Sequence, residues 1–248
     1  MARRRLKPAD FDERMTLVEH LDELRTRIVA SGIVLVLAIT VCFWQDELLL
    51  DIANEPLPPG FLPTTLSPTE PFFTTIKLSF YGGLLISLPL LLYQIYAFVL
   101  PAFAPHEKKL VLPFLLSVPV LFIGGATFAY FVVMPAALDF LLGFNADEFD
   151  TQLRGSEYYS FFVLTLIAVG ILFQIPVAVL AVCRLGIVTP EQLAQNRRYA
   201  VLLIAVAAML LPGTDPVTML LSMAPLYALF EFSLALAKVF GRPPDEAE

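Results

Sequence analysis

The stretch Tyr158–Cys183 reads YYSFFVLTLIAVGILFQIPVAVLAVC and contains no charged side chain. A helix that crosses a lipid bilayer needs about 20 consecutive, mostly apolar residues, so this stretch is long enough to span one with some tilt. It therefore predicts a transmembrane helix. Further runs of the same kind decide how many times the chain crosses.

Three more uncharged runs of this kind precede it in the chain. They are Ile28–Trp44, Leu78–Ala104 and Leu110–Leu138. Two shorter runs follow, Tyr199–Leu211 and Val217–Phe230, joined by a tight turn at 212–216 that contains Asp215. Thirteen helical residues extend only about 20 Å, against about 30 Å of hydrocarbon. The short pair either crosses a thinned bilayer or forms a re-entrant hairpin, and both arrangements return the chain to the same side.

Composition places the whole chain among membrane proteins. Hydrophobic residues make up 58% of the 248 residues and charged residues 16%, whereas a soluble domain is typically about 45–50% apolar and about 25% charged. The net charge of −7 disfavours nucleic-acid binding. The sequence holds no GxxxxGK[ST] loop, no HExxH and no Cys/His metal cluster. We therefore expect a protein that is not an enzyme and uses no cofactor or metal.

Lysine and arginine are unevenly distributed between the predicted loops. In a six-span arrangement one side holds Arg3, Arg4, Arg5, Lys7, Arg14, Arg25, Arg27, Lys108, Lys109, Arg184, Arg197, Arg198, Lys238 and Arg242. The other side holds only Arg154, with Lys77 at the mouth of the second span. Because the basic side of a membrane protein faces the cytoplasm, we expect both termini there.

The expected fold is all-α, a polytopic six-helix bundle with kinked helices, short fifth and sixth spans, and an N-in/C-in arrangement. The single domain 1–248 would begin with a cytoplasmic segment 1–27, with spans at about 28–45, 73–99, 109–135, 158–184, 198–211 and 217–237 and outer loops at 46–72, 136–157 and 212–216. Kinks are expected where proline removes a backbone donor, at Pro89, Pro119, Pro176 and Pro225. The proline-rich loop Asp46–Pro71 predicts a stiff cap on the outer face.

An amphipathic helix is expected immediately before the first span. Thr16 and Glu19 fit a capping box, and the leucines and isoleucine that follow form one apolar stripe. Glu23 lies on another face together with Arg27, four residues on. Two interpretations stay open: a surface helix with an ordinary ion pair, or a carboxylate placed for binding.

Four other polar residues need an explanation. Glu107 is the only carboxylate of a short basic loop and either balances charge at a helix start or binds a ligand. Gln94, Gln174 and Glu231 lie within or near apolar runs. Polar side chains at that depth are placed for function, for docking a partner, or for hydrogen bonds between helices.

Several segments together resemble the TatC family, the multi-span subunit of the twin-arginine protein translocase. LVEHLDELRTR at 17–27 is similar to the family's HLxELRxR segment, and EPFFTTIK at 70–77 to its PFFxxIK. YQIYAFVLP at 93–101 followed by HEKK at 106–109 resembles its first cytoplasmic loop. FAYFVV at 128–133, FQIPVA at 173–178 and FE at 230–231 extend the resemblance in order along nearly the whole chain.

The resemblance implies a receptor for twin-arginine signal peptides on folded cargo, working in an oligomeric complex with small single-span subunits of the TatA and TatB type, driven by the proton motive force. The family's two recognition carboxylates correspond to Glu23 and Glu107. Arg25 would shape that site, Phe98 would pack beside the peptide, and Lys109 is a further site residue. Gln174, Gln94, Glu231 and Asp215 would be intramembrane polar or partner-docking residues.

One position departs from the resemblance, and one rival function stays open. Many relatives carry Glu where Gln174 stands, so a proton-switching role there is in doubt although a hydrogen-bonding role is not. The rival is a secondary transporter of a small ion or solute, with Gln94, Gln174 and Glu231 along its path. It predicts uptake by the purified protein alone, without any need for Glu23.

Overall fold

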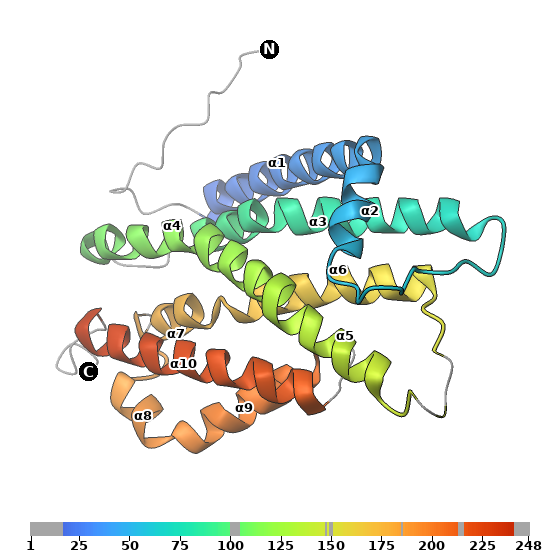
Figure 1. The fold of residues 1–248 in the computed structure, drawn as a ribbon. Helices are drawn as coiled ribbons and strands as arrows, with labels where there is room; N and C mark the ends of the chain where they lie inside the picture. Colours follow the sequence, from blue (N-terminus) through green and yellow to red (C-terminus); the bar gives the residue numbers. More distant parts are fainter. Residues whose placement is uncertain are drawn as a thin grey trace, which may run out of the picture.

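The computed structural model describes residues 17–99, 105–146, 148, 151–184, 186–212 and 216–240. Apart from one isolated bridge, the regular elements of this part of the chain are helices (Figure 1). In chain order they are α1 (Leu17–Trp44), α2 (Asp46–Asn54), α3 (Glu70–Val99), α4 (Pro105–Phe128), the π-helix η2 (Ala129–Val133), α5 (Met134–Gly143), α6 (Gly155–Leu172), α7 (Ile175–Arg184), α8 (Pro190–Gln195), α9 (Arg197–Met209) and α10 (Pro216–Phe240).

Five helical segments of the described chain are long and apolar enough to cross a membrane. They are His20–Trp44, Glu70–Phe98, Leu116–Gly143, Gly155–Arg184 and Pro216–Lys238. The prediction of an all-α polytopic bundle is confirmed. Helix α9, with 13 residues, is short as expected for the fifth span.

The boundaries of the sixth span agree with the expected 217–237, but its length and two of the loops differ from the sequence-based expectations. Helix α10 has 25 residues and continues through Glu231, so only its uncharged run is short. The third span continues as α5 to Gly143, beyond the expected end at 135. The loop expected at 46–72 contains α2 and the first turn of α3. In each case a polar or proline residue that suggested an end is accommodated inside a helix or next to one.

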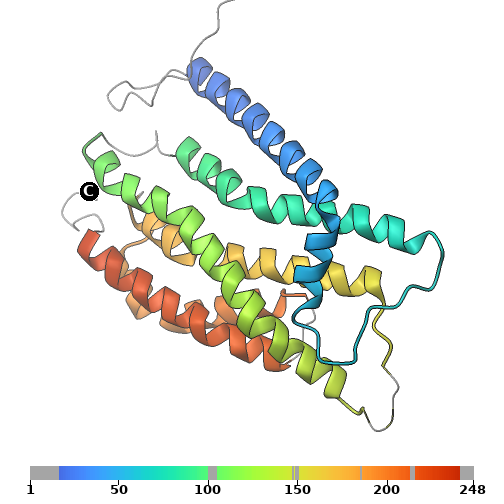
Figure 2. The same ribbon diagram turned by 45° about the horizontal axis from the view of Figure 1, so that its top comes forward.

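The bundle has a buried centre and a peripheral first helix. Figures 1 and 2 show α1 at one edge beside α3, α9 and α10 at the opposite edge, and α6 between them. In the most apolar part of the α6–α7 span half of the residues are buried, whereas in the corresponding part of α1 only 6% are. The main apolar core accordingly centres on α6 side chains such as Phe162, Val163 and Val169. Helix α1 depends almost wholly on α3 for its position.

Small residues permit the closest helix crossings. A Cβ atom added at Gly83 of α3 would lie 2.6 Å from backbone atoms of Ile39 in α1. At the crossing of α4 and α6, a Cβ at Gly125 would lie 2.9 Å from the Cα of Gly170. Such contacts between small residues let helix backbones approach within a membrane, where packing drives association.

Prolines have different local effects in different helices. Pro89 and Pro225 lie inside the continuous helices α3 and α10. Pro135 follows a π-helical turn in which the Met134 amide donates to the Ala129 carbonyl, and Pro176 follows the break between α6 and α7. Because proline cannot donate to the preceding turn, the backbone adjusts at the last two positions, by a π-helical turn in the third span and by a break between α6 and α7 in the fourth (Figure 1).

Helix α2 covers one end of the bundle and is held there by three tyrosines. The hydroxyl of Tyr158 donates to the carbonyl of Ala53, and the hydroxyl of Tyr159 donates to Asn54 Oδ1 at 3.0 Å. The Tyr130 Oη lies 3.1 Å from the Ile52 carbonyl oxygen. The expected cap therefore exists, but its helix is fixed by tertiary hydrogen bonds and not only by proline stiffness.

The rest of the proline-rich loop is fastened to the start of α6. The Thr64 amide donates to the Leu153 carbonyl at 2.7 Å, and the Gly155 amide donates to the Thr64 carbonyl at 2.9 Å. Glu70, which is 7% exposed, accepts hydrogen bonds from the Leu66 amide, Arg154 Nε and Ser156 Oγ at 2.7–2.8 Å. The carboxylate also raises the pKa of Arg154 through its hydrogen bond and its charge. Two loop segments at the same end of the bundle are thus joined at one carboxylate.

Candidate functional site

The Glu23 carboxylate lies where α1 meets the end of α3, opposite the end that α2 covers. Its Oε1 accepts hydrogen bonds from Arg27 Nε at 2.9 Å and from Arg27 Nη2 at 2.5 Å. The two side chains are 18% and 22% exposed. The i, i+4 spacing brings them together on one helix face, so the ion pair considered from the sequence is present.

Gln94 belongs to the same cluster, although it lies 67 residues further along the chain. Its Oε1 accepts from Arg27 Nη1 at 2.7 Å. The guanidinium therefore bridges α1 and α3, with one edge on a carboxylate and the remaining terminal nitrogen on an amide. A charged donor strengthens each of these bonds, which fixes the orientation of the Glu23 carboxylate.

The other side of Glu23 faces His20 and Phe98. The His20 ring stacks on Phe98 with centroids 4.2 Å apart and planes inclined by 10°. His20 Nδ1 and Glu23 Oε2 are 3.8 Å apart, which is too far for a hydrogen bond. Both atoms are buried and have no hydrogen-bond partner in the described chain. A buried carboxylate oxygen without a partner is costly, so this oxygen is free to accept from a further donor.

The remaining residues expected at this site have different positions. Arg25 is exposed, and since residues two apart do not share a helix face, it points away from the Glu23 carboxylate. Glu107 and Lys109 belong to α4, but their side chains lie outside the described residues. The structure thus brings together Glu23 and Phe98 from the expected set.

Gln174 lies at the break between α6 and α7 and is 4% exposed. Its Nε2 donates to the Val118 carbonyl at 3.2 Å and lies 3.4 Å from the Gly170 carbonyl, while its Oε1 is buried without a partner. This geometry corresponds to the internal hydrogen-bond alternative. The partner-docking role of Gln174 stays a prediction.

Glu231 forms a separate polar cluster on α10. Its Oε2 lies 3.1 Å from Arg197 Nη2 at the start of α9, and its Oε1 accepts from the Tyr227 hydroxyl at 2.8 Å. These contacts join α9 to α10 and explain how a carboxylate stays inside a long apolar helix. Asp215 lies outside the described residues.

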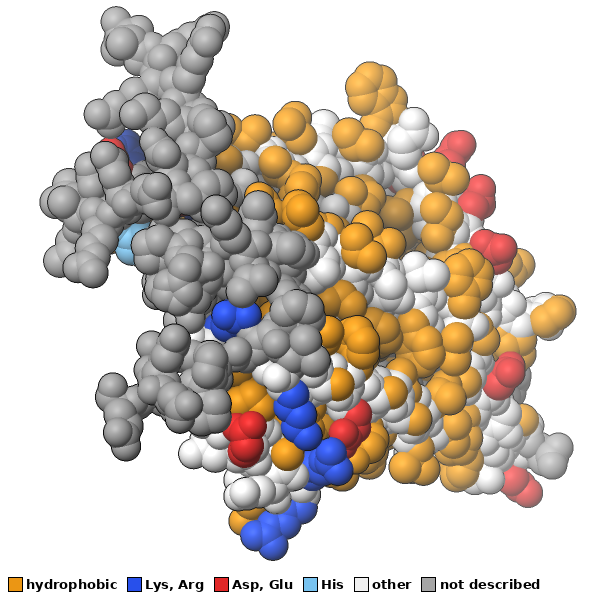
Figure 3. Space-filling view, turned by 90° about the vertical axis from the view of Figure 1, so that its left-hand side faces the viewer, with side chains coloured by type: hydrophobic (Ala, Val, Ile, Leu, Met, Phe, Trp, Pro, Cys, Tyr) orange, Lys and Arg blue, Asp and Glu red, His pale blue; other side chains and the backbone are white. Residues whose placement is uncertain are grey.

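Basic side chains gather at the end of the bundle that carries the Glu23 site. Figure 3 views this end and shows Lys and Arg grouped on its lower part, beside exposed apolar side chains. Arg197 and Arg198 at the start of α9 are exposed there. This is the end that the distribution of Lys and Arg predicts to be cytoplasmic.

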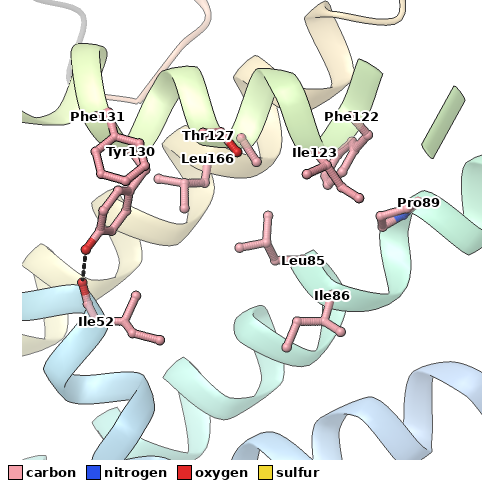
Figure 4. Close-up of a pocket in the computed structure, with 11 residues that line it drawn as sticks. Ile52, Leu85, Ile86, Pro89, Phe122, Ile123, Thr127, Tyr130, Phe131 and Leu166 are labelled. Atoms are coloured by element: carbon pink, nitrogen blue, oxygen red, sulfur yellow. Dashed lines mark hydrogen bonds between the residues drawn. The ribbon is translucent and has the colours of Figure 1, made fainter. Parts of the chain in front are cut away.

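An open apolar groove of about 560 Å³ lies between α3, α4 and η2. Figure 4 shows Leu85 and Ile86 on one side, Phe122 and Ile123 on the other, and the Tyr130 hydroxyl at one end on the Ile52 carbonyl. Its lining includes the hydroxyls of Thr127 and Tyr130 but no carboxylate, imidazole, amine or thiol. The groove can accommodate apolar matter but offers no chemistry.

Glu23 and Phe98 are expected at this site from the sequence, whereas the meeting of His20, Arg27 and Gln94 with them is not. The i, i+3 and i, i+4 spacings of His20 and Arg27 from Glu23 were available as a signal. The contact with Gln94 was not, because it depends on how α1 and α3 cross.

Three comparisons with known proteins agree on one family. Residues 19–225 match the family model described as Sec-independent protein translocase protein (TatC). The TatC protein of Aquifex aeolicus is 37% identical over 240 residues, which cover 94% of this chain and 99% of that protein. The TatC protein of Koribacter versatilis is 34% identical over 231 residues, covering 90% of this chain and 85% of that one.

A solved structure gives the same result. The crystal structure of the twin arginine translocase receptor TatC in the detergent DDM superposes with a TM-score of 0.76 at 37% sequence identity. The match covers 91% of this chain and 100% of the other. By family model, by sequence and by structure, the chain belongs to the TatC family of Sec-independent protein translocase proteins.

Proposed function

We propose that this translocase protein binds the twin-arginine signal peptides of folded precursor proteins, with Glu23 as one of the groups that receive an arginine. The observation that carries the proposal is the state of the Glu23 carboxylate. One oxygen is held by Arg27, and the other is buried without a partner among the described residues. A signal peptide would bring the missing donor.

The chemistry of the two partners favours arginine over lysine. A guanidinium presents planar N–H donors that match a fixed carboxylate, whereas an ammonium is a compact, strongly hydrated point charge. Glu107 is proposed as the second carboxylate, with Lys109 shaping the site and Phe98 packing beside the peptide. Arg25 would contribute only from the edge of the site, because it points away from the Glu23 carboxylate. The exposed apolar surface of α1 and α3 near this end would receive the hydrophobic part of the signal.

The basic end would face the cytoplasm, where folded cargo arrives, with both termini on that side of a bacterial or archaeal cytoplasmic membrane. Single-span subunits of the TatA and TatB type are proposed as partners in an oligomeric complex, with Gln174 supporting their docking. The deep burial of Gln174 indicates that it would act through the packing of α4 against α6 and α7.

A secondary transporter is the less favoured alternative. It would need Gln94, Gln174 and Glu231 along one path. Each instead has its own partner: Arg27, the Val118 carbonyl and Arg197, respectively. Uptake of an ion or solute by the purified protein alone would support the transporter over the receptor.

The receptor proposal is tested by binding of a labelled signal peptide to the purified full chain in detergent. We expect the Arg-Arg peptide to bind at least tenfold more tightly than its Lys-Lys counterpart, and Glu23→Ala or Glu107→Ala to remove most of this preference. Equal binding of both peptides by the unaltered protein, or full preference in both variants, would contradict the proposal.

A further inference from the structure

The two oxygens of the Glu23 carboxylate have different surroundings. Arg27 directs two donors to Oε1 alone, at 2.9 and 2.5 Å, instead of one donor to each oxygen. The third bond of this guanidinium, to Gln94 at 2.7 Å, keeps Arg27 from rotating toward Oε2. Oε1 is therefore committed to the protein's own arginine.

The uncommitted oxygen has an equally uncommitted neighbour. Oε2 lies 3.8 Å from His20 Nδ1, and within the part of the chain that the structure describes neither atom has a hydrogen-bond partner. With its proton on Nε2, a neutral imidazole presents Nδ1 as an acceptor. Two acceptors 3.8 Å apart cannot bond each other, but they can each accept from one group that carries two donors.

The position of His20 is fixed independently of Glu23. Its ring lies flat on Phe98 at 4.2 Å and 10°, which covers one face and leaves the ring edge for hydrogen bonding. The three-residue spacing from Glu23 places that edge beside the carboxylate. Phe98 thereby acts as the support of the imidazole, which gives this residue a role more specific than packing beside the peptide.

We propose that His20 Nδ1 and Glu23 Oε2 together receive one guanidinium of the signal peptide, with one N–H to each atom. His20 is then a specificity-determining residue, and Arg27 and Gln94 are positioning residues that keep Oε1 occupied. The proposal rests on the receptor function above. It gives a partner to two buried atoms that lack one among the described residues, and it assigns His20 to one arginine of the pair, since one guanidinium can donate to both neighbouring acceptors.

The test is a double-mutant cycle between His20 and each arginine of the peptide. His20→Phe keeps an aromatic ring to stack on Phe98 and removes the acceptor. Peptides with Lys at the first, the second or neither arginine position are titrated against the unaltered chain and this variant. We expect His20→Phe to weaken Arg-Arg binding about tenfold, the effect of one lost hydrogen bond to a charged group, and to remove the arginine preference at one position only.

Each result has a defined meaning. If His20→Phe weakens the binding of all three peptides equally, His20 has only a structural role and the proposal is overturned. Tighter binding by His20→Phe would also overturn it, because it would mean that the His20 ring repels the peptide's guanidinium. If the unaltered chain does not prefer Arg-Arg, the receptor function itself fails. If the preference is present and sensitive to Glu23→Ala but unchanged in His20→Phe, only the present inference fails.

A second measurement does not depend on a variant that binds. The ¹⁵N chemical shift of His20 Nδ1 in the labelled full chain reports hydrogen bonding at that atom, and His20→Phe identifies its signal. We expect the Arg-Arg peptide to shift this resonance and the Lys-Lys peptide to leave it in place. A resonance that stays unchanged at saturating Arg-Arg peptide would overturn the proposal.

Discussion

Two adjacent glycines in α4 allow the tightness of the bundle to be measured against an internal control. An alanine Cβ at Gly125 would lie 2.7 Å from the Cγ of Phe173 and 2.9 Å from the Cα of Gly170 in α6. The same atom at Gly124 would meet nothing within 4 Å. The two substitutions are chemically identical and differ only in the surface of α4 on which the methyl group lies.

The difference in stability between the two variants depends on packing alone, because the gain in helix propensity is the same in both and cancels. Each alanine replaces a helical glycine and gains about 1 kcal/mol of helix propensity. Gly125→Ala also overpacks a close crossing, which typically costs about 1–3 kcal/mol, and backbone cannot rotate away as a side-chain end could. Gly125→Ala should therefore be less stable than Gly124→Ala by about 1–3 kcal/mol, whatever the propensity is worth inside a membrane.

The assay can use the two cysteines of the chain. Cys42 and Cys183 are 3% and 2% exposed, so a thiol-reactive dye added during heating reports unfolding in detergent. At about 2–4 °C per kcal/mol for a chain of this size, the midpoints should differ by about 2–12 °C. Equal midpoints for the Gly124 and Gly125 variants would refute the claim that this crossing is limited by backbone contact.

Three further substitutions test other contacts. Gly83→Ala should displace α1 from α3, because its Cβ would lie 2.6 Å from Ile39 backbone atoms. Signal-peptide affinity should therefore fall by at least threefold in a binding titration. Unchanged affinity would show that the Glu23 site does not depend on how closely α1 and α3 cross. Glu70→Gln removes the closer of two charged partners of Arg154 and should speed trypsin cleavage after that arginine, while an unchanged digestion rate would contradict the proposed fastening. Gln174→Leu should weaken crosslinking to single-span subunits and leave peptide binding largely intact; undiminished crosslinking would count against it.

The fold was largely readable from uncharged run lengths, and the errors have physical causes. The run before Glu231 suggested a short sixth span. The helix continues because Arg197 and Tyr227 provide partners for that carboxylate, and such compensation cannot be seen in a run of letters. Helix α2 was hidden by the prolines that follow it and is held by Tyr158 and Tyr159, 105 positions away from their acceptors.

The site was predictable where its geometry is local and unpredictable where it is tertiary. Helical spacing alone places Arg27 and His20 beside Glu23, so both contacts could be foreseen. The hydrogen bond from Arg27 to Gln94 joins two helices whose relative position depends on the contact of Gly83 with Ile39. No pattern within either helix encodes that distance.

The two interpretations of Glu23 left open by the sequence do not exclude each other, because a carboxylate has two oxygens. An isolated surface glutamate would move between rotamers, and ordering such a side chain on binding costs about 0.5–1.5 kcal/mol. The internal ion pair with Arg27 imposes that order before any ligand arrives, at the expense of one oxygen. What remains is a single fixed acceptor beside a fixed imidazole, and the discrimination between arginine and lysine then depends on donor geometry more than on net charge. The ordinary ion pair is thus the feature that makes a selective site possible.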